Sequence, residues 1–418
     1  MSALTSKKRL LVFHSAYTFR DLKTRGLEVF VTARDAGKVF DTVLTVNAVA
    51  SLQYPGAEAE TCAPPEFHQL DPRNVILEGR IRRFSLLSKL KFLDFFFAQI
   101  SIIKAIVLHG RLSEVTLIRA EDPRFNGLYG YFFSRVLRKP LVVGVWGNPA
   151  RIREDSKSPL MPRLFKSIRA EERVENFVLR RADMVLAQNE ENMSYVLDHG
   201  VDLNRTLILP LGIGIDACHF AERDNRLDVR EDFKQLKVDG KYLIVCVSRL
   251  ENIKLVDHAI RSCSGLENSK IDFQLLLIGD GRDRDLLAKL ANDLGMADRV
   301  KFAGNRSQEW IAGALVLADL AIAPLTGRAL LEIALAGCPV AAFDVDWHKE
   351  IVRSGETGEL VEFLNDEALG DAIVHIIEND KLRHHYGEKI RTLALEMAQP
   401  AKLAAKQAEI YRLLIGRN

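Results

Sequence analysis

The chain has 418 residues, of which 48% are hydrophobic and 27% are charged, and its formal net charge at pH 7 is +2. Because this length exceeds one ordinary hydrophobic core, we expect two domains of roughly 200 residues each. The composition is typical of a soluble globular protein, and so small a net charge excludes a general attraction to nucleic acid.

The start of the chain and its cysteines predict a cytoplasmic protein. The polar residues Met1–Arg9 lead into the short apolar run Leu10–Phe13, which lacks the length and the cleavage site of a signal peptide. No stretch approaches the roughly 20 apolar residues that a transmembrane helix needs. The five cysteines are scattered and form no Cys-x-x-Cys pair, so we expect reduced thiols rather than disulfides or a zinc site.

Short apolar runs alternate with longer amphipathic segments, which predicts an α/β fold of βαβ units with parallel sheets. The predicted strands of the first half are Arg9–Phe13, Thr42–Val46, Val115–Ile118, Leu141–Val145, Met184–Ala187 and Thr206–Leu209. Those of the second half are Tyr242–Val247, Phe273–Ile278, Val300–Phe302, Leu320–Ala323 and Val340–Phe343. The predicted helices include Arg169–Arg181, Asp283–Leu294 and Leu330–Ala336.

The composition changes after Pro210–Asp216, where a charged stretch precedes the next predicted strand. We therefore place one Rossmann-like domain at 1–213 and a second one at 214–398. The end of the chain is typical of two amphipathic helices that Gln399-Pro400 interrupts, because proline ends or kinks a helix. We expect the tail 399–418 to cross back to the first domain.

Several motifs of the second half follow a predicted strand, where open α/β sheets bind their ligands. Arg249 and Lys254 lie in one short loop after the strand Tyr242–Val247. An arginine fork and a lysine point charge that converge on the same oxygens can neutralise a nucleoside diphosphate. The alternative is that both are solvated loop cations.

Two glycine-containing motifs follow the next strands. Gly279, Asp280 and Gly281 stand between a strand and a helix, and glycine permits positive φ and close backbone approach. Phe302 and Gly304 end the following strand, where backbone groups can contact the edge of a base. A plain strand-to-helix turn is the alternative for the first motif.

Glu332 lies early in a predicted helix that follows Thr326, Gly327 and Arg328. A carboxylate at this place can accept hydrogen bonds from two ribose hydroxyls, and Arg328 can add a third cation near the phosphates. The alternative for Glu332 is an acidic partner of the helix N-terminus.

In this order and spacing, the motifs resemble the C-terminal domain of the family 4 retaining glycosyltransferases, which have the GT-B fold. The resemblance covers about 243–361 and rests on Arg249-x4-Lys254, Gly279-Asp280-Gly281, Gly304, Ala318-Asp319, Pro324, Glu332, Gly337-x-Pro339-Val340, Glu350 and Gly355–Gly358. It implies two facing Rossmann-like domains with an interdomain cleft. It also implies that Arg249 and Lys254 hold the donor diphosphate, that Glu332 binds the ribose, and that no metal is required.

Two departures from the family pattern concern the donor sugar and the acceptor. The family usually has a second acidic residue eight positions before the equivalent of Glu332, in a Glu-x7-Glu pattern, but this chain has Pro324 there. The usual acidic contact to the donor sugar is therefore absent. The family's Gly-Gly loop after the first strand is missing too, and His14–Arg20 stands in its place.

The candidate residues for the acceptor side are His14, Arg119, Asn148 and His348, each near the end of a predicted strand. A packed, hydrogen-bonded side chain is the alternative for His14, and a satisfied turn is the alternative for His348. Asp344-Val345-Asp346 has the form of the metal-binding Asp-x-Asp of a different glycosyltransferase fold. It lies too far toward the C-terminus for that fold, so we expect no metal site.

Cations and aromatic residues mingle in the segment 80–106, which contains Arg80, Arg82, Arg83, Lys89 and Lys91 among several phenylalanines. A basic helix with an aromatic face can lie in a membrane interface and contact anionic lipid headgroups. The alternative is a core helix with a solvated basic end.

We predict a glycosyltransferase that moves a sugar from a nucleoside-diphosphate sugar, with UDP as the expected carrier, to a lipid-linked or polysaccharide acceptor. By the family resemblance, transfer retains the anomeric configuration and needs no cofactor. The enzyme would be cytoplasmic or peripheral on the inner membrane face. Two alternatives stay open: a sugar-nucleotide epimerase on the same fold, and a catalytically degenerate partner or scaffold subunit.

Overall fold

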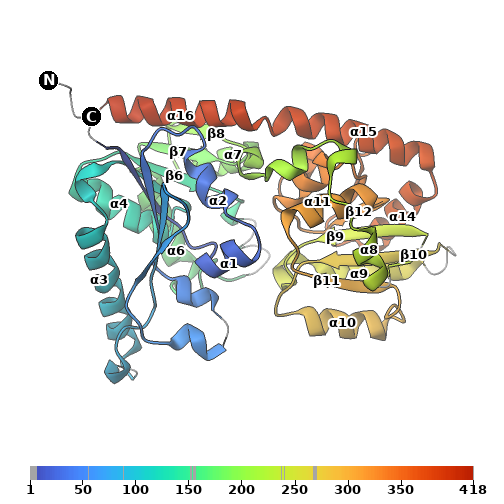
Figure 1. The fold of residues 1–418 in the computed structure, drawn as a ribbon, viewed down its shortest axis with the longest axis horizontal. Coiled ribbons are helices and arrows are strands. Elements are labelled where there is room, and N and C mark those ends of the chain that lie inside the picture. The colour runs from blue at the N-terminus through green and yellow to red at the C-terminus, as the bar shows by residue number, and fades with distance from the viewer. Residues whose placement is uncertain are drawn as a thin grey trace. The chain divides into compact units, whose positions relative to one another are not determined.

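The computed structural model describes residues 7–54, 56–87, 89–150, 153, 157–236, 238–239, 241–266 and 271–417. The chain divides into two compact units, Met1–Ile213 with Ala401–Asn418 (unit 1) and Gly214–Pro400 (unit 2). Each unit has its own predominantly parallel sheet with helices around it (Figure 1). The predicted α/β class with a parallel sheet in each half is therefore confirmed.

Unit 1 contains an eight-stranded sheet in the order β3-β4-β2-β1-β5-β6-β7-β8, and only the β3–β4 pair in it is antiparallel. Its strands are β1 Arg9–Phe13, β2 Thr42–Asn47, β3 Glu66–Gln69, β4 Asn74–Glu78, β5 Val115–Ala120, β6 Leu141–Val145, β7 Met184–Ala187 and β8 Thr206–Ile208. Its α-helices are α1 Phe19–Thr24, α2 Val29–Thr32, α3 Lys91–His109, α4 Phe125–Leu137, α6 Ile168–Leu179, α7 Glu190–Asp198 and α16 Pro400–Gly416.

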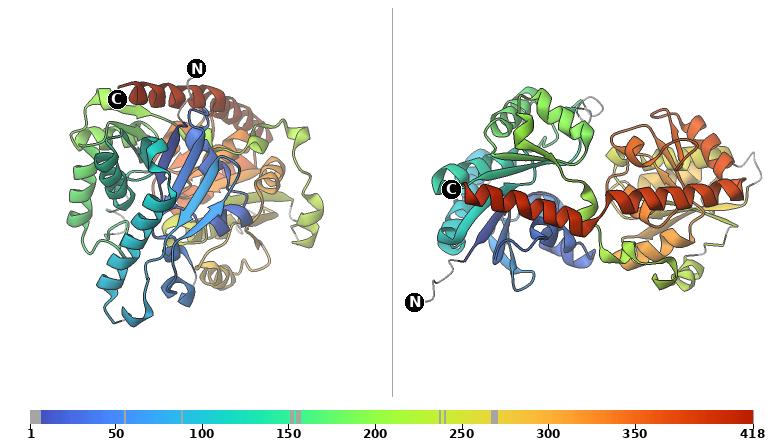
Figure 2. Two further views of the ribbon diagram at one scale, coloured as in Figure 1. Left: turned by 60° about the vertical axis from the view of Figure 1, so that its left-hand side comes forward. Right: turned by 90° about the horizontal axis from the view of Figure 1, so that it is seen from above.

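Alternate side chains of these strands pack on opposite faces of the unit 1 sheet, as the two-residue period of a strand requires. Leu10 and Val142 pack with Tyr411 of α16 on one face. Leu11 and Val143 belong to the core on the other face, where α3, α4 and α6 pack. The last helix, α16, therefore completes the core of unit 1. Figure 2 shows the course of this helix, in red, along unit 1.

Unit 2 contains a six-stranded parallel sheet in the order β11-β10-β9-β12-β13-β14. Its strands are β9 Tyr242–Val247, β10 Phe273–Ile278, β11 Val300–Gly304, β12 Leu320–Ala323, β13 Val340–Phe343 and β14 Glu359–Val361. Its α-helices are α8 Arg230–Gln235, α9 Val256–Ser264, α10 Arg284–Asp293, α11 Gln308–Leu317, α12 Ala329–Leu335, α13 His348–Ile351, α14 Asp366–Ile377 and α15 Asp380–Met397.

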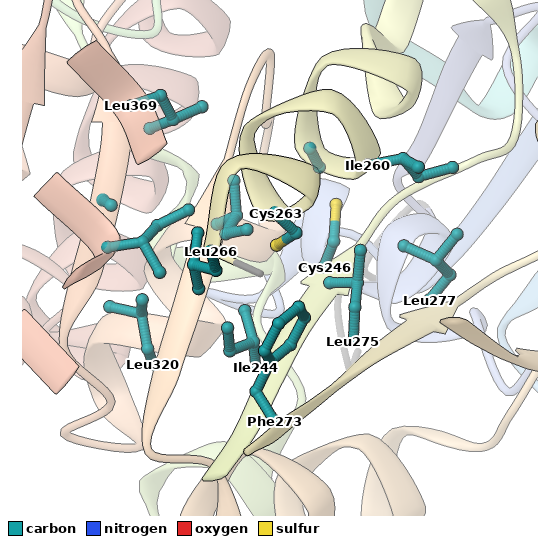
Figure 3. Close-up of a cluster of buried hydrophobic side chains, with 14 of the residues drawn as sticks. Ile244, Cys246, Ile260, Cys263, Leu266, Phe273, Leu275, Leu277, Leu320 and Leu369 are labelled. Carbon is teal, nitrogen blue, oxygen red and sulfur yellow. The ribbon is translucent and has the colours of Figure 1, made fainter. Parts of the chain in front are cut away.

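The core of unit 2 explains why its central strands are apolar throughout. Side chains of β9 and β10, among them Ile244 and Phe273, pack against α9 (Figure 3). The thiols of Cys246 and Cys263 lie in this cluster, and burial raises the pKa of both. They are free thiols, as predicted.

The segment 80–106 differs from the predicted basic helix. Its helix, α3, begins only at Lys91, so Arg80, Arg82 and Arg83 precede the helix. Residue 88 lies outside the described residues. Arg82 is buried and pairs with Asp94 at 2.7 Å. By length and composition α3 could cross a membrane, so the prediction that no stretch approaches that length was wrong. The few charged residues in α3 interrupt its apolar run without making it polar.

Candidate functional site

The strand order of unit 2 reverses direction at β9, because β10 and β11 extend to one side and β12, β13 and β14 to the other. The carboxyl ends of parallel strands lie at the same edge of a sheet, and ligands of open α/β sheets bind where the order reverses. The loops after β9 and β12 flank this point. The predicted donor-site residues lie at the end of β11, in loops after the strands of this sheet, or in the helix α12.

The loop after β9 brings Arg249 and Lys254 together. The Arg249 side chain is 51% exposed and pairs with Glu251 at 3.1 Å between Nη1 and Oε2. Lys254 ends a short 3₁₀ turn, and its pKa is lowered by burial and by the charge of Arg249. The two like charges repel each other, and the arrangement favours an anionic ligand. Glu251, which the sequence analysis did not single out, offsets part of this repulsion.

The glycines after β10 let the loop that contains them pack closely against the loop after β9, which contains Arg249 and Lys254. Gly279 has a φ of +137°, and a Cβ there would lie 1.9 Å from the carbonyl oxygen of Ser248. A Cβ on Gly281 would lie 2.2 Å from the carbonyl oxygen of Leu250. The Leu250 N–H in turn donates to the Asp280 carbonyl at 3.1 Å. The neighbour that approaches these glycines closely is the chain's own loop, which fits the strand-to-helix turn that was the alternative for this motif.

Phe302 and Gly304 form the end of β11 beside this loop. The Gly279 N–H donates to the Gly304 carbonyl at 2.9 Å, and Gly304 has a φ of +71° with open space where a Cβ would be. The Arg284 guanidinium lies 5.3 Å from the centroid of the half-buried Phe302 ring. An aromatic ring beside a cation at this edge is a surface on which a planar base can stack.

Arg328 and Glu332 form an ion pair at the start of α12. Glu332 is only 3% exposed and is the single charged residue of a helix that is otherwise apolar. Arg328 Nε donates to Glu332 Oε1 at 2.9 Å, one helical turn away. The pair explains how a carboxylate is tolerated here, since a buried charge without a partner is costly.

His348 is fully buried and fastens the loop after β12 to the end of β13. Its Nδ1 lies 2.9 Å from the carbonyl oxygen of Phe343, and its Nε2 lies 3.1 Å from the amide nitrogen of Thr326. The ring therefore donates from Nδ1 and accepts at Nε2 in its neutral form. Burial lowers its pKa to about 4. Both ring nitrogens serve the fold, so the structure gives this predicted acceptor-side residue a positioning role in unit 2.

The Asp344–Asp346 segment follows β13 at the same edge. Asp346 has a φ of +51°, an uncommon backbone conformation for a residue other than glycine, and its charge acts on Lys254. Within the part of the chain that the structure describes, no three His, Cys, Asp or Glu side chains are grouped as metal ligands.

In unit 1, His14 follows β1 at the point where the strand order reverses between β1 and β5. Its side chain is completely buried, and burial and Arg34 together hold its pKa well below the ordinary value of 6.5. The Ala16 N–H approaches Nδ1 at 3.4 Å, whereas Nε2 has no hydrogen-bond partner among the described residues. The neutral imidazole therefore has one buried ring nitrogen without a partner among the described residues.

Arg119 and Asn148 are both engaged within unit 1. The buried Arg119 guanidinium pairs with Glu121 at 2.7 Å and donates to the hydroxyl of Tyr411 at 2.6 Å, so it ties α16 to β5. Asn148 follows β6 and donates from Nδ2 to Glu191 Oε1 at 2.9 Å. These contacts give Arg119 and Asn148 partners within the fold, whereas Nε2 of His14 has none among the described residues.

Comparison with known proteins agrees with this geometry. Residues 228–393 match the family of glycosyl transferases group 1. The chain is 25% identical over 197 residues to N-acetyl-alpha-D-glucosaminyl L-malate synthase of Bacillus anthracis, a match that spans 45% of this chain and 51% of that protein. It is also 25% identical over 293 residues to alpha-D-kanosaminyltransferase of Streptomyces kanamyceticus, covering 68% of this chain and 73% of that one.

Solved structures share the fold over nearly the whole chain. Sucrose-phosphate synthase of Thermosynechococcus elongatus has a TM-score of 0.75 at 17% identity and covers 99% of this chain and 100% of its own. HepE of Anabaena, solved in complex with UDP and glucose, has a TM-score of 0.71 at 18% identity, with 96% and 99% covered. The chain therefore has the GT-B fold, and residues 228–393 in unit 2 match the glycosyl transferases group 1 family.

Proposed function

We propose that this protein transfers a sugar from a nucleoside-diphosphate sugar to a glycan or lipid-linked acceptor, as in polysaccharide biosynthesis. The observation that carries the proposal is that one loop, at the point where the strand order of unit 2 reverses, holds both Arg249 and Lys254, and the charge of Arg249 lowers the pKa of Lys254. A diphosphate placed there would relieve the repulsion between the two cations and accept hydrogen bonds from both. The group 1 glycosyltransferase match over this same unit supports that assignment.

The donor would occupy the carboxyl edge of the unit 2 sheet. Arg249 and Lys254 would bind the diphosphate, Glu332 the ribose hydroxyls, and the Phe302 side of the edge the base. UDP is the proposed carrier, and the fold shared with HepE, which was solved with UDP and glucose, supports it. As the leaving diphosphate gains charge, the two cations would stabilise it more strongly than the ground state, which is electrostatic catalysis.

We propose further that transfer retains the anomeric configuration and needs no metal ion. The positive charge that a divalent cation would supply to the diphosphate is provided here by Arg249 and Lys254, with Arg328 as a further cation at the start of α12. We assign the acceptor to unit 1, where His14 is its proposed polar contact, and we place the enzyme in the cytoplasm or on the inner membrane face.

The test is a transfer assay with the purified full-length chain, a panel of nucleoside-diphosphate sugars, and glycan and lipid-linked acceptors, in buffer with EDTA. A glycosylated product with the anomeric configuration of the donor is the expected result. A changed donor sugar without any acceptor would replace the proposal with an epimerase. Nucleotide binding without sugar release from any donor would replace it with a scaffold subunit. Activity that appears only with added metal would overturn the metal-independent part.

A further inference from the structure

One surface of unit 1 exposes many large apolar side chains close together in the sequence. We call it the α3 surface, and it consists of Phe84, Leu86, Leu90, Phe92, Leu93, Phe96, Phe97, Ile100, Val107 and Leu108. Leu86 is 96% exposed and Phe92 is 81% exposed. Large contiguous apolar surfaces are rare on soluble monomers and indicate a binding surface for another apolar body.

The exposure follows from how α3 packs. Its buried residues are Asp94, Ala98, Ile102 and Ile106, which recur every four residues and form a single narrow stripe. That stripe faces the core of unit 1, and Ile103 and Ala105 pack against the same core while partly buried. The side chains of the α3 surface remain exposed. Figures 1 and 2 show α3 on the outer side of unit 1, with the unit's sheet on one side of it.

The charge of this surface has one sign. Lys89, Lys91 and Lys104 are exposed around the apolar side chains. Asp94 is the only carboxylate between Gly79 and Arg111, and it is fully buried. Exposed apolar side chains surrounded by lysines are complementary to a bilayer that carries anionic headgroups.

The contacts of α3 exclude a helix that crosses the bilayer while unit 1 stays folded. Ile102 and Ile106 are completely buried in the core. Asp94 accepts hydrogen bonds from the backbone N–H groups of Arg83 and Phe84, both at 2.8 Å, in addition to its ion pair with Arg82. These contacts hold the start of the helix in the fold.

We propose that the α3 surface docks unit 1 on a membrane that contains anionic lipid, with the phenylalanines inserted at the headgroup level and the lysines beside the phosphates. This inference does not depend on the proposed sugar transfer, because it rests on unit 1 alone and its test reads lipid binding rather than activity.

The experiment is cosedimentation of the full-length chain with vesicles of phosphatidylcholine alone and with about 30% phosphatidylglycerol added. We expect binding to the anionic vesicles that weakens in high salt. Phe92→Ser combined with Phe96→Ser should lower the partition coefficient at least about tenfold, since it removes two exposed aromatic anchors. Lys89→Gln and Lys104→Gln should each lower the partition coefficient by roughly fivefold on the anionic vesicles and leave it unchanged on phosphatidylcholine vesicles.

The matched control is Leu203→Ser combined with Leu286→Ser, which removes two leucines that are 67% and 66% exposed outside the α3 surface. This control should bind as the wild type does. All the variants change exposed side chains, and their thermal melts should match that of the wild type. Absence of vesicle binding by the wild type, or equal loss in the control, would overturn the proposal. If the wild type forms a dimer that the phenylalanine variant does not form, and does not bind vesicles, the surface would instead bind a second copy of the chain.

Discussion

Replacing Arg249 with alanine should separate ligand chemistry from folding. The Arg249 side chain is 51% exposed and pairs with Glu251 at 3.1 Å, and exposed pairs of this kind stabilise a fold by about 0–1 kcal/mol. We therefore expect the free energy of unfolding to change by less than about 1 kcal/mol. A hydrogen bond to a charged group contributes about 1.5–3 kcal/mol, so turnover should fall more than roughly tenfold and as much as about a hundredfold.

The assay measures nucleotide release in the presence of acceptor, together with denaturant unfolding of the same preparations. Arg353→Ala is the matched control, because Arg353 is 49% exposed, pairs with Glu356 at 3.6 Å and precedes β14 at the amino-terminal side of that strand. The control should keep its turnover. Near-native turnover of a folded Arg249→Ala protein would refute the role of this residue, and equal losses in both variants would refute its specificity.

Three further predictions concern the same unit. Burial lowers the pKa of His348 from 6.5 to about 4. As the pH falls, this histidine is therefore protonated in the unfolded chain before it is protonated in the folded protein. The free energy of unfolding should fall by up to about 3 kcal/mol between pH 6.5 and pH 4. Denaturant unfolding of His348→Gln across this range should lack that share of the pH dependence, and an unaltered profile would contradict the argument. Gly279→Ala should lower the free energy of unfolding by at least about 2 kcal/mol in the same assay, because the new Cβ would be strained by the positive φ and would clash with the Ser248 carbonyl. Gly327→Ala is the control and should change the free energy of unfolding little, because there is open space where its Cβ would be. Glu332→Gln should weaken binding of the nucleoside diphosphate at least about tenfold by calorimetry, and an unchanged Kd would remove Glu332 from the site.

Most of the buried strands could be predicted from the sequence, whereas the exposed ones could not. The run Phe273–Ile278 is apolar throughout, because both faces of its parallel sheet are covered, and its predicted bounds are those of β10. The strand β3 was not predicted, because Glu66–Gln69 is a largely exposed edge strand with little apolar pattern. The strand β4, Asn74–Glu78, was missed as well, although it is mostly buried. The three residues of β14, Glu359–Val361, are too few for any periodicity to appear.

The candidate site shows a similar division. Spacing along the chain placed Arg249 and Lys254 in one loop, and the glycine motif indicated the close approach that Gly279 makes. Spacing could not predict what His348 contacts, because its partner Thr326 lies 22 residues earlier in the chain. The two residues come together only because β12 and β13, which precede them, pair in the folded sheet. For Arg119 the unpredictable partner was Tyr411, which comes 292 residues later in the chain.

The α3 surface could be predicted from composition only in part. Its cations and aromatic residues were evident, and they indicated an interfacial segment. Which apolar side chains remain exposed depends on the single stripe that unit 1 buries, and an apolar run by itself does not distinguish a helix buried on all sides from one buried along a stripe.

Above all, we propose that unit 2 binds a nucleoside diphosphate through its own cations. The most direct test is thermal stabilisation of the purified chain by UDP, GDP, ADP and CMP in the presence of EDTA. A ligand present at about a hundred times its Kd stabilises the folded state by about 2.7 kcal/mol, so binding should raise the Tm clearly. We predict a shift with UDP that Arg249→Ala diminishes. No shift with any of the four nucleotides, in protein that melts cooperatively, would contradict the claim.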